Sequence, residues 1–202
     1  MQQYIVFDFD GVLSDSFDVF LESLIKVQPK YFTKKTKAEL KNISRFVGLN
    51  ALDVNADVFH DFTMDLRKAY VARAEQIGLY PNVCEMLAKL KEMDTKIGIV
   101  SSNDTSLIIS ILKKYNLEED FDFIIGDINL NGKDKTLSEL SQKGVALEKS
   151  WYIGDTPHDI RSAKFAGMKS VAACWGYSSN EMLLKESPDF CFSEVLQILS
   201  LI

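Results

Sequence analysis

The chain has 202 residues, of which 47% are hydrophobic and 26% charged, a composition that is typical of a globular domain and excludes a disordered or collagen-like chain. Its 23 lysines and arginines against 29 aspartates and glutamates give a formal net charge of −6, which argues against a protein that binds nucleic acid or anionic membranes through a basic surface. The length suits one domain that carries a smaller insertion.

The N-terminus and the cysteines indicate the cellular compartment of the chain. The first ten residues contain two aspartates and no basic residue, so we expect no signal peptide. No apolar run reaches the roughly 18 residues of a membrane span. The three cysteines, Cys84, Cys174 and Cys191, form no CxxC pair, so we expect reduced, buried thiols. These features predict a cytoplasmic protein with no membrane partner.

Five short apolar runs predict buried strands. They are Tyr4–Phe7, Ile97–Val100, Phe123–Ile125, Trp151–Ile153 and Ser170–Cys174. Helical patterns such as Val83–Leu90 and Leu107–Leu112 alternate with them. Continuous apolar strands that alternate with amphipathic helices predict an α/β fold, with a Rossmann-like parallel sheet and helices on both of its faces.

The stretch from residue 16 to residue 79 breaks this alternation. It contains no convincing strand, and Phe62, Leu66 and Tyr70, like Phe59 before them, recur at helical spacing. We therefore expect a small all-helical cap domain at 16–79, inserted into a catalytic core domain formed by 1–15 and 80–202.

The first part of this insertion is strongly basic. Between residues 26 and 45, Glu39 alone offsets Lys26, Lys30, Lys34, Lys35, Lys37, Lys41 and Arg45. This charge forms either a solvated helix face or a positively charged lid over an anionic substrate.

Polar residues follow three of the expected strands, where ligands bind in parallel α/β sheets. They are Asp8 and Asp10, the run Ser101 to Asn103, and Asp155. The directions of the Asp8 and Asp10 side chains depend on the path of the backbone at the end of the strand. Gly11 permits that backbone to curl after Asp10. Several carboxylates within a few ångströms need a cation to offset them, and a set of oxygen ligands favours Mg²⁺ over zinc. With only His60 and His158 in the chain, a histidine metal site is excluded, and we expect a surface or supporting role for His158.

Four segments, in order along the chain, resemble the motifs of the haloacid dehalogenase superfamily. They are Asp8–Leu13 with the following Ser14-Asp15-Ser16, then Ser101 after its strand, then Gly132-Lys133, and finally Gly154–Ile160 with the following Ala163–Met168. The helical insertion lies where phosphoglycolate-phosphatase-like members of the superfamily carry a helical cap.

The resemblance implies a Mg²⁺-dependent phosphatase that hydrolyses a small phosphorylated metabolite, a phosphomonoester, through an aspartyl-phosphate intermediate. It implies that Asp8 is the nucleophile and Asp10 the general acid and base. Ser101, Lys133 and the backbone near Gly11, Ser102 and Asn103 would bind the phosphoryl oxygens, and Asp159 would orient Lys133 or a metal-bound water. The implied Mg²⁺ ligands are Asp8, the backbone carbonyl of Asp10, and Asp155.

Two departures from the family pattern leave alternatives open. The third motif reads Lys133-Asp134-Lys135-Thr136 instead of K-P-x-P, so Lys135 is an alternative to the favoured Lys133. Ala51 stands where sugar-phosphate mutases carry an arginine, which disfavours a phosphomutase of the β-phosphoglucomutase type without excluding it.

Two further activities are disfavoured by the residues present. A dehalogenase needs neither the second carboxylate, Asp10, nor the third, Asp155. A catalytically silent binding protein would have lost the nucleophile or the acid, whereas Asp8, Asp10, Ser101, Lys133 and Asp155 are all present. We expect no nucleic-acid partner and a monomer.

Overall fold

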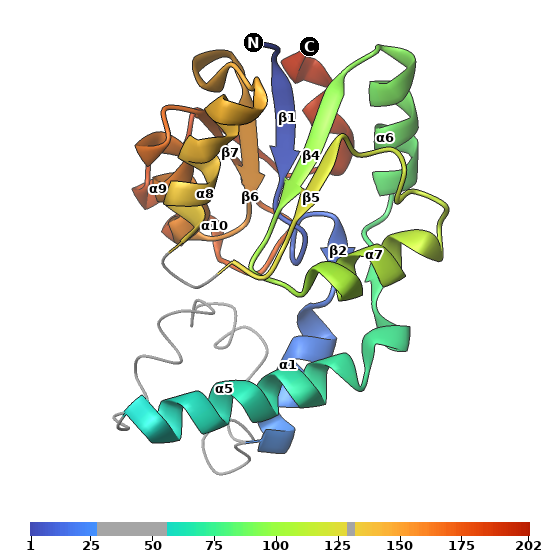
Figure 1. The fold of residues 1–202 in the computed structure, drawn as a ribbon, viewed down its shortest axis with the longest axis vertical. Helices are drawn as coiled ribbons and strands as arrows, with labels where there is room; N and C mark the ends of the chain where they lie inside the picture. Colours follow the sequence, from blue (N-terminus) through green and yellow to red (C-terminus); the bar gives the residue numbers. More distant parts are fainter. Residues whose placement is uncertain (28–55, 129–131) are drawn as a thin grey trace.

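The computed structural model describes residues 1–27, 56–128 and 132–202, and its centre is a six-stranded parallel sheet (Figure 1). The strands lie in the order β5 (Phe123–Ile125), β4 (Lys96–Val100), β1 (Tyr4–Phe7), β6 (Trp151–Gly154), β7 (Lys169–Ala173) and β8 (Phe190–Phe192). The first strand of the chain therefore lies in the middle of the sheet. Its Val6 pairs with Gly98 of β4 on one side and with Tyr152 of β6 on the other.

The described helices come between and after these strands. They are α1 (Phe17–Val27), α5 (Ala56–Val71), α6 (Val83–Glu92), α7 (Thr105–Lys113), α8 (Lys133–Glu139), α9 (Pro157–Phe165) and α10 (Asn180–Lys185). Short 3₁₀ segments add η1 (Ala74–Gln76), η2 (Leu140–Lys143), η3 (Leu147–Lys149) and η4 (Val195–Leu201).

The alternation of side chains along β1 divides the core into two layers. Ile5 and Phe7 pack with the buried faces of α6, α7 and η4. Tyr4 and Val6 point to the opposite face of the sheet, where they pack with residues of α8, α9 and η2. Both faces of the sheet are thus covered, which explains why its strands are continuous apolar runs. The predicted α/β fold is confirmed.

A helical insertion leaves the sheet after β1. The antiparallel pair β2 (Ser14–Asp15) and β3 (Gly78–Leu79) carries the chain out and back, and α1 and α5 pack against each other between them. Figure 1 shows this pair of helices beyond the carboxyl ends of β1, β4 and β6, while both chain termini lie at the opposite end. The insertion therefore lies next to the edge of the sheet at which the polar residues of the sequence motifs follow the strands.

The expected helical spacing is present in α5. Phe62, Leu66 and Tyr70 are all buried against the core cluster. Ala51 and the side chain of Phe59 lie outside the described residues. The basic stretch also lies outside them, apart from Lys26, which is exposed. The domain limits at residues 15 and 80 stay a prediction.

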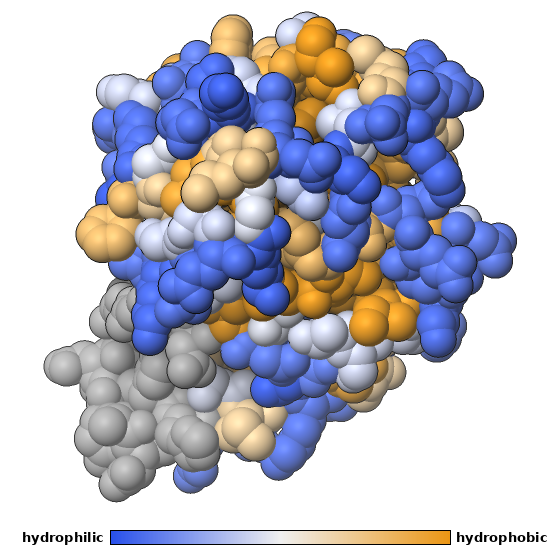
Figure 2. All heavy atoms as spheres, turned by 45° about the horizontal axis from the view of Figure 1, so that its top comes forward, coloured by the Kyte–Doolittle hydropathy of each residue, from blue (hydrophilic) through white to orange (hydrophobic). Residues whose placement is uncertain are grey.

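The face of the molecule shown in Figure 2 is mixed in hydropathy. Hydrophilic residues dominate the face shown in Figure 2, with hydrophobic residues visible between them. No helix in 1–27, 56–128 or 132–202 combines the length and the apolar character that a membrane span requires.

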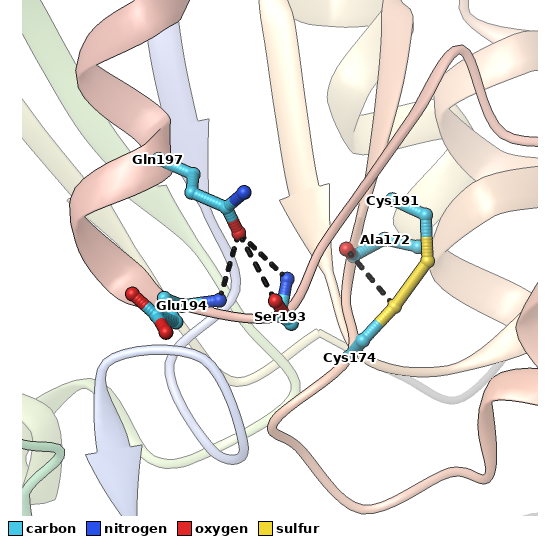
Figure 3. The surroundings of a disulfide bond; sticks show 6 residues. All are labelled: Ala172, Cys174, Cys191, Ser193, Glu194 and Gln197. Atoms are coloured by element: carbon cyan, nitrogen blue, oxygen red, sulfur yellow. Dashed lines mark hydrogen bonds between the residues drawn. A yellow bond between two sulfur atoms is a disulfide. The ribbon is translucent and has the colours of Figure 1, made fainter.

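The expectation of three reduced, buried thiols was wrong. Cys174 and Cys191 form a disulfide (Figure 3), with 6.4 Å between their Cα atoms, and Cys84 is exposed. The sequence reasoning missed strand β8, which pairs with β7 so that Cys191 lies opposite Ala172. That register brings two cysteines that are 17 residues apart within bonding reach.

Candidate active site

The site lies where the order of the strands reverses. After β1 the chain builds β4 and β5 on one side, then crosses to build β6, β7 and β8 on the other. Asp8, Ser101 and Asp155 directly follow β1, β4 and β6, which are neighbours in the sheet. Because parallel strands end at the same edge, their topology brings these three residues together.

A tight turn after β1 places Asp8 and Asp10. The Phe9 carbonyl oxygen accepts hydrogen bonds from the N–H groups of Val12, Leu13 and Ser14. Gly11 has a φ of +79°, and a Cβ atom at this position would collide with Asp155 Oδ2. Glycine is therefore required both by the curl of the backbone and by the closeness of Asp155.

Asp8 lies beside Lys133 in a buried ion network. The Lys133 ammonium donates to Asp8 Oδ2 at 2.9 Å and to Asp159 Oδ1 at 2.6 Å. The nearby Ser101 hydroxyl also lowers the pKa of Asp8, by less than Lys133 does. Asp159 accepts further bonds at Oδ2 from the backbone N–H and hydroxyl of Thr156, in the capping box that begins α9.

Burial and charge act in opposite directions on these groups. Burial raises the pKa of Asp8, and Lys133 counters only part of that rise. Burial alone would raise the pKa of Asp159 too, but the Lys133 ammonium brings it below its usual value. The pKa of Lys133 is well above its usual value because Asp159 and Asp8 outweigh the effect of burial. Lys133 is therefore a permanent cation in contact with Asp8.

Asp155 completes a group of carboxylates suited to a cation. Oxygen atoms of Asp8, Asp155 and Asp159 all lie within 4.8 Å of one another, and each of the three residues is buried. Burial, together with the nearby Asp159 and Asp8, raises the pKa of Asp155 well above its usual value. This crowding of acids fits a hard divalent cation such as Mg²⁺, which would offset the charge and reverse the rise. The Asp10 carboxylate is not part of this group, because other side chains hold it. Its backbone carbonyl is therefore the atom that Asp10 could offer to a metal.

The Asp10 carboxylate is held by side chains from three segments of the chain. Its Oδ1 accepts hydrogen bonds from the hydroxyls of Ser16, at 2.7 Å, and Tyr70, at 2.6 Å. Its Oδ2 accepts one from Asn103 Nδ2 at 2.8 Å. The Ser16 oxygen also lies 2.6 Å from the Tyr177 hydroxyl. Asp10 is only 2% exposed, so these contacts fix a carboxyl group that water hardly reaches.

The loop after β4 contains the remaining residues expected at the site. Ser101 and Asn103 are buried, and the Asn103 N–H lies 3.3 Å from the Ser101 hydroxyl. Ser102 is half-buried between them. Asp104 then caps α7 by accepting from the N–H groups of Ser106 and Leu107.

The geometry distinguishes the two candidate lysines. Lys133 is 4% exposed and contacts Asp8, whereas the side chain of Lys135 is 79% exposed and lies 3.8 Å from Glu139. The His158 ring is half-buried near Ser162, at 3.2 Å, and burial lowers its pKa. The supporting role expected for His158 stays a prediction.

Sequence reasoning missed Tyr70, Ser16 and Tyr177. Ser16 stands in the segment that resembles the first family motif, but that resemblance assigned it no role. Tyr70 was expected only as an apolar position of a helix. In Tyr177, the N–H also donates to Asp155 Oδ2 at 2.8 Å, and no pattern in the sequence indicates this contact.

Comparisons with known proteins identify the family of the chain. The family model described as haloacid dehalogenase-like hydrolase matches residues 5–173. A pyrophosphatase PpaX of Bacillus pumilus is 27% identical over 98% of this chain and 95% of its own length. A phosphoglycolate phosphatase of Synechococcus elongatus is 27% identical over 96% of each chain.

Solved structures share the fold. A haloacid dehalogenase-like hydrolase family protein of Streptococcus pneumoniae superposes with a TM-score of 0.81 at 24% identity, over 98% of this chain and 97% of its own. A hydrolase of Pseudomonas syringae gives 0.79 at 18% identity, over 98% and 97%. With a family model that matches most of its length, the chain belongs to the haloacid dehalogenase-like hydrolases.

Proposed function

We propose that this hydrolase is a Mg²⁺-dependent phosphatase that cleaves a small phosphomonoester through a phosphorylated Asp8. The observation that carries the proposal is the different setting of two carboxyl groups in one turn. The Asp8 carboxylate accepts a hydrogen bond from Lys133, whereas the Asp10 carboxylate accepts hydrogen bonds from Ser16, Tyr70 and Asn103. Two carboxyls with different partners suit two different roles.

In the first step an Asp8 oxygen attacks phosphorus, and the bond between phosphorus and the ester oxygen breaks. Asp10 gives its proton to the leaving alkoxide. Lys133 and Ser101 hold the phosphoryl oxygens, where stabilisation of charge matters most. In the second step water attacks the phosphorus bound to Asp8, Asp10 accepts the proton of that water, and inorganic phosphate leaves.

Asp8 and Asp155, with the Asp10 carbonyl, would hold the Mg²⁺ ion, and Asp159 would keep Lys133 in place. When bound, the ion supplies positive charge between the carboxylates and the phosphate oxygens, which otherwise repel each other. The closeness of the buried Asp8 and Asp155 carboxylates, within 4.8 Å of each other, supports this assignment, and the Lys133 contact of Asp159 supports the other role.

The Asp10 setting favours an ester over an anhydride as substrate. An alkoxide is a poor leaving group and needs a proton, whereas the phosphate released from pyrophosphate leaves more easily. The relatives named above include a pyrophosphatase and a phosphoglycolate phosphatase, so both substrate types belong in the test.

The test is release of inorganic phosphate by the purified chain with Mg²⁺, from 2-phosphoglycolate, a hexose phosphate, a nucleoside monophosphate and pyrophosphate. We expect turnover of at least one ester, its loss in Asp8→Asn, and normal turnover in Glu181→Gln, whose side chain is 80% exposed on α10. Rapid quenching should trap one phosphoryl group per chain. Turnover in Asp8→Asn at the wild-type rate would contradict the proposal, and conversion of the hexose phosphate into an isomer would indicate a mutase.

A further inference from the structure

The hydrogen bond from Tyr70 to Asp10 joins the helical insertion to the turn after β1. Tyr70 lies in the last turns of α5, sixty residues beyond Asp10, and its hydroxyl donates to Asp10 Oδ1 at 2.6 Å. Both residues are buried, Tyr70 at 5% exposure and Asp10 at 2%. The contact is therefore shielded from competing water, which strengthens a hydrogen bond to a carboxylate.

A second contact from the same helix docks α5 on the sheet. Arg67, three residues before Tyr70 and on the same side of the helix, donates to Asp104 at the start of α7 and to Asp127, at 3.1 Å, after β5. Both aspartates follow strand ends at the edge where the site lies. The Arg67 side chain is 53% exposed, so this clamp lies at the surface while the Tyr70 contact lies inside.

The terminal torsion of an aspartate is broad, so a carboxyl group keeps one orientation only if its partners fix it. Ser16 lies between β2 and α1, and Asn103 lies in the loop after β4. Tyr70 alone among these three donors comes from α5. The orientation of Asp10 therefore depends in part on where α5 lies.

We propose that Tyr70 is a positioning residue that orients the Asp10 carboxyl for proton transfer to the leaving group, and so ties that step to the docking of α5. This inference rests on the proposed phosphatase function. Small displacements of a reacting group are costly in rate, so loss of one orienting hydrogen bond should slow the step without preventing substrate binding.

Tyr70→Phe removes the hydroxyl and keeps the buried ring. For the best alkyl phosphate we expect kcat to fall about tenfold, a part of the 10²–10⁴-fold that general acid catalysis contributes, with KM within about twofold of wild type. Rapid-quench measurement of phosphoryl transfer to the enzyme should show this loss for the alkyl ester and little loss for 4-nitrophenyl phosphate, whose leaving group needs no proton. Ser16→Ala, which removes another donor to the same oxygen, should repeat the pattern even if Tyr70→Phe is poorly folded.

Three controls separate positioning from simple docking. Tyr115→Phe removes a hydroxyl from a partly exposed tyrosine and should leave kcat and KM unchanged. Arg67→Gln loosens the surface clamp but keeps the Tyr70 hydroxyl, so its loss of kcat should be smaller than that of Tyr70→Phe and again larger for the alkyl ester than for the aryl ester. In an Asp10→Asn background, Tyr70→Phe should cause no further loss, because the group that it orients no longer transfers a proton.

Several outcomes would overturn the inference. Unchanged phosphoryl transfer in Tyr70→Phe would do so, as would a raised KM with equal losses on both esters, since Tyr70 would then act only as a tether. A further loss in the Asp10→Asn background would show that Tyr70 acts through another group. A wild-type enzyme that is inactive on every ester would instead remove the proposed function, and the inference with it.

Discussion

Lys133 and Asp159 form an ion pair with both side chains buried, and 2.6 Å separates Lys133 Nζ from Asp159 Oδ1. Lys133 of this pair also donates to Asp8. An isolated charge is expensive to bury, so Asp159 keeps a cation available beside Asp8 in a place that water hardly reaches.

Asp159→Asn should therefore lower the stability of the folded chain. It removes a buried negative charge, leaves Lys133 with Asp8 as its acidic partner and weakens the capping box of α9. We expect a loss of about 3 kcal/mol in the free energy of unfolding, near the lower end of the usual cost of breaking a buried ion pair. Urea denaturation at pH 7 measures it. The matched control is Lys135→Ala at an exposed pair, which should change stability by less than about 0.5 kcal/mol.

Asp104 makes part of the stability depend on pH. Hydrogen bonds from Ser106, followed by the Arg67 contact, lower its pKa from 3.8 to about 2. Because folding lowers this pKa, the contribution of Asp104 is fully present above pH 3.8 and is lost as the pH falls through about 2. NMR titration of the carboxyl carbon should find this low value, and Arg67→Gln should raise it. A pKa near 3.8 in the wild-type protein would contradict the arrangement of these residues.

The site formed by Asp8, Asp155 and the Asp10 backbone carbonyl should bind Mg²⁺ in the absence of substrate. Binding to the folded state alone raises its stability, by about 2.7 kcal/mol at a concentration one hundred times Kd. A thermal-shift titration should therefore show a rise in Tm with MgCl₂, absent in Asp155→Asn and present in Glu181→Gln. EDTA should abolish phosphatase activity, and Mg²⁺ should restore it. An identical rise in Tm for Asp155→Asn would exclude this group as the site.

The sequence predicted what depends on local pattern and on the order of the strands. Five of the six strands of the sheet were expected from apolar runs, and Asp8, Ser101 and Asp155 were expected together because their strands end at one edge. Strand β8 was missed because Phe190–Phe192 is short and only Phe192 is buried. The disulfide between Cys174 and Cys191 was missed with it, since its formation depends on the β7–β8 register.

The contacts of Asp10 could not be predicted for a different reason. Helical spacing correctly placed Tyr70 on the buried face of α5, but periodicity does not say which buried tyrosine hydroxyl needs a partner. A phenol in a core must find an acceptor, and here the acceptor comes from the turn after β1. Only the three-dimensional packing of α5 near that turn identifies it.

Gly11 offers a test of the closeness of the turn to Asp155. Gly11, with φ +79°, and Gly144, with φ +88°, both have a left-handed backbone, but a Cβ at Gly11 would meet Asp155 whereas a Cβ at Gly144 has nothing within 4 Å. Alanine in this conformation costs about 1–2 kcal/mol at either position. Gly144→Ala should therefore lose about that much stability and keep its kcat.

Gly11→Ala carries the same backbone cost and a collision in addition. Either Asp155 moves or the turn opens, and both displace a carboxylate from the group formed with Asp8. We expect Gly11→Ala to lose the rise in Tm with Mg²⁺ and at least 90% of phosphatase activity, a loss of the size that displacement of a reacting group by about 1 Å can cause. Thermal melts with and without Mg²⁺, together with steady-state kinetics of both variants, measure the difference. Equal behaviour of the two alanine variants would show that the backbone conformation alone, and not the contact with Asp155, requires glycine at position 11.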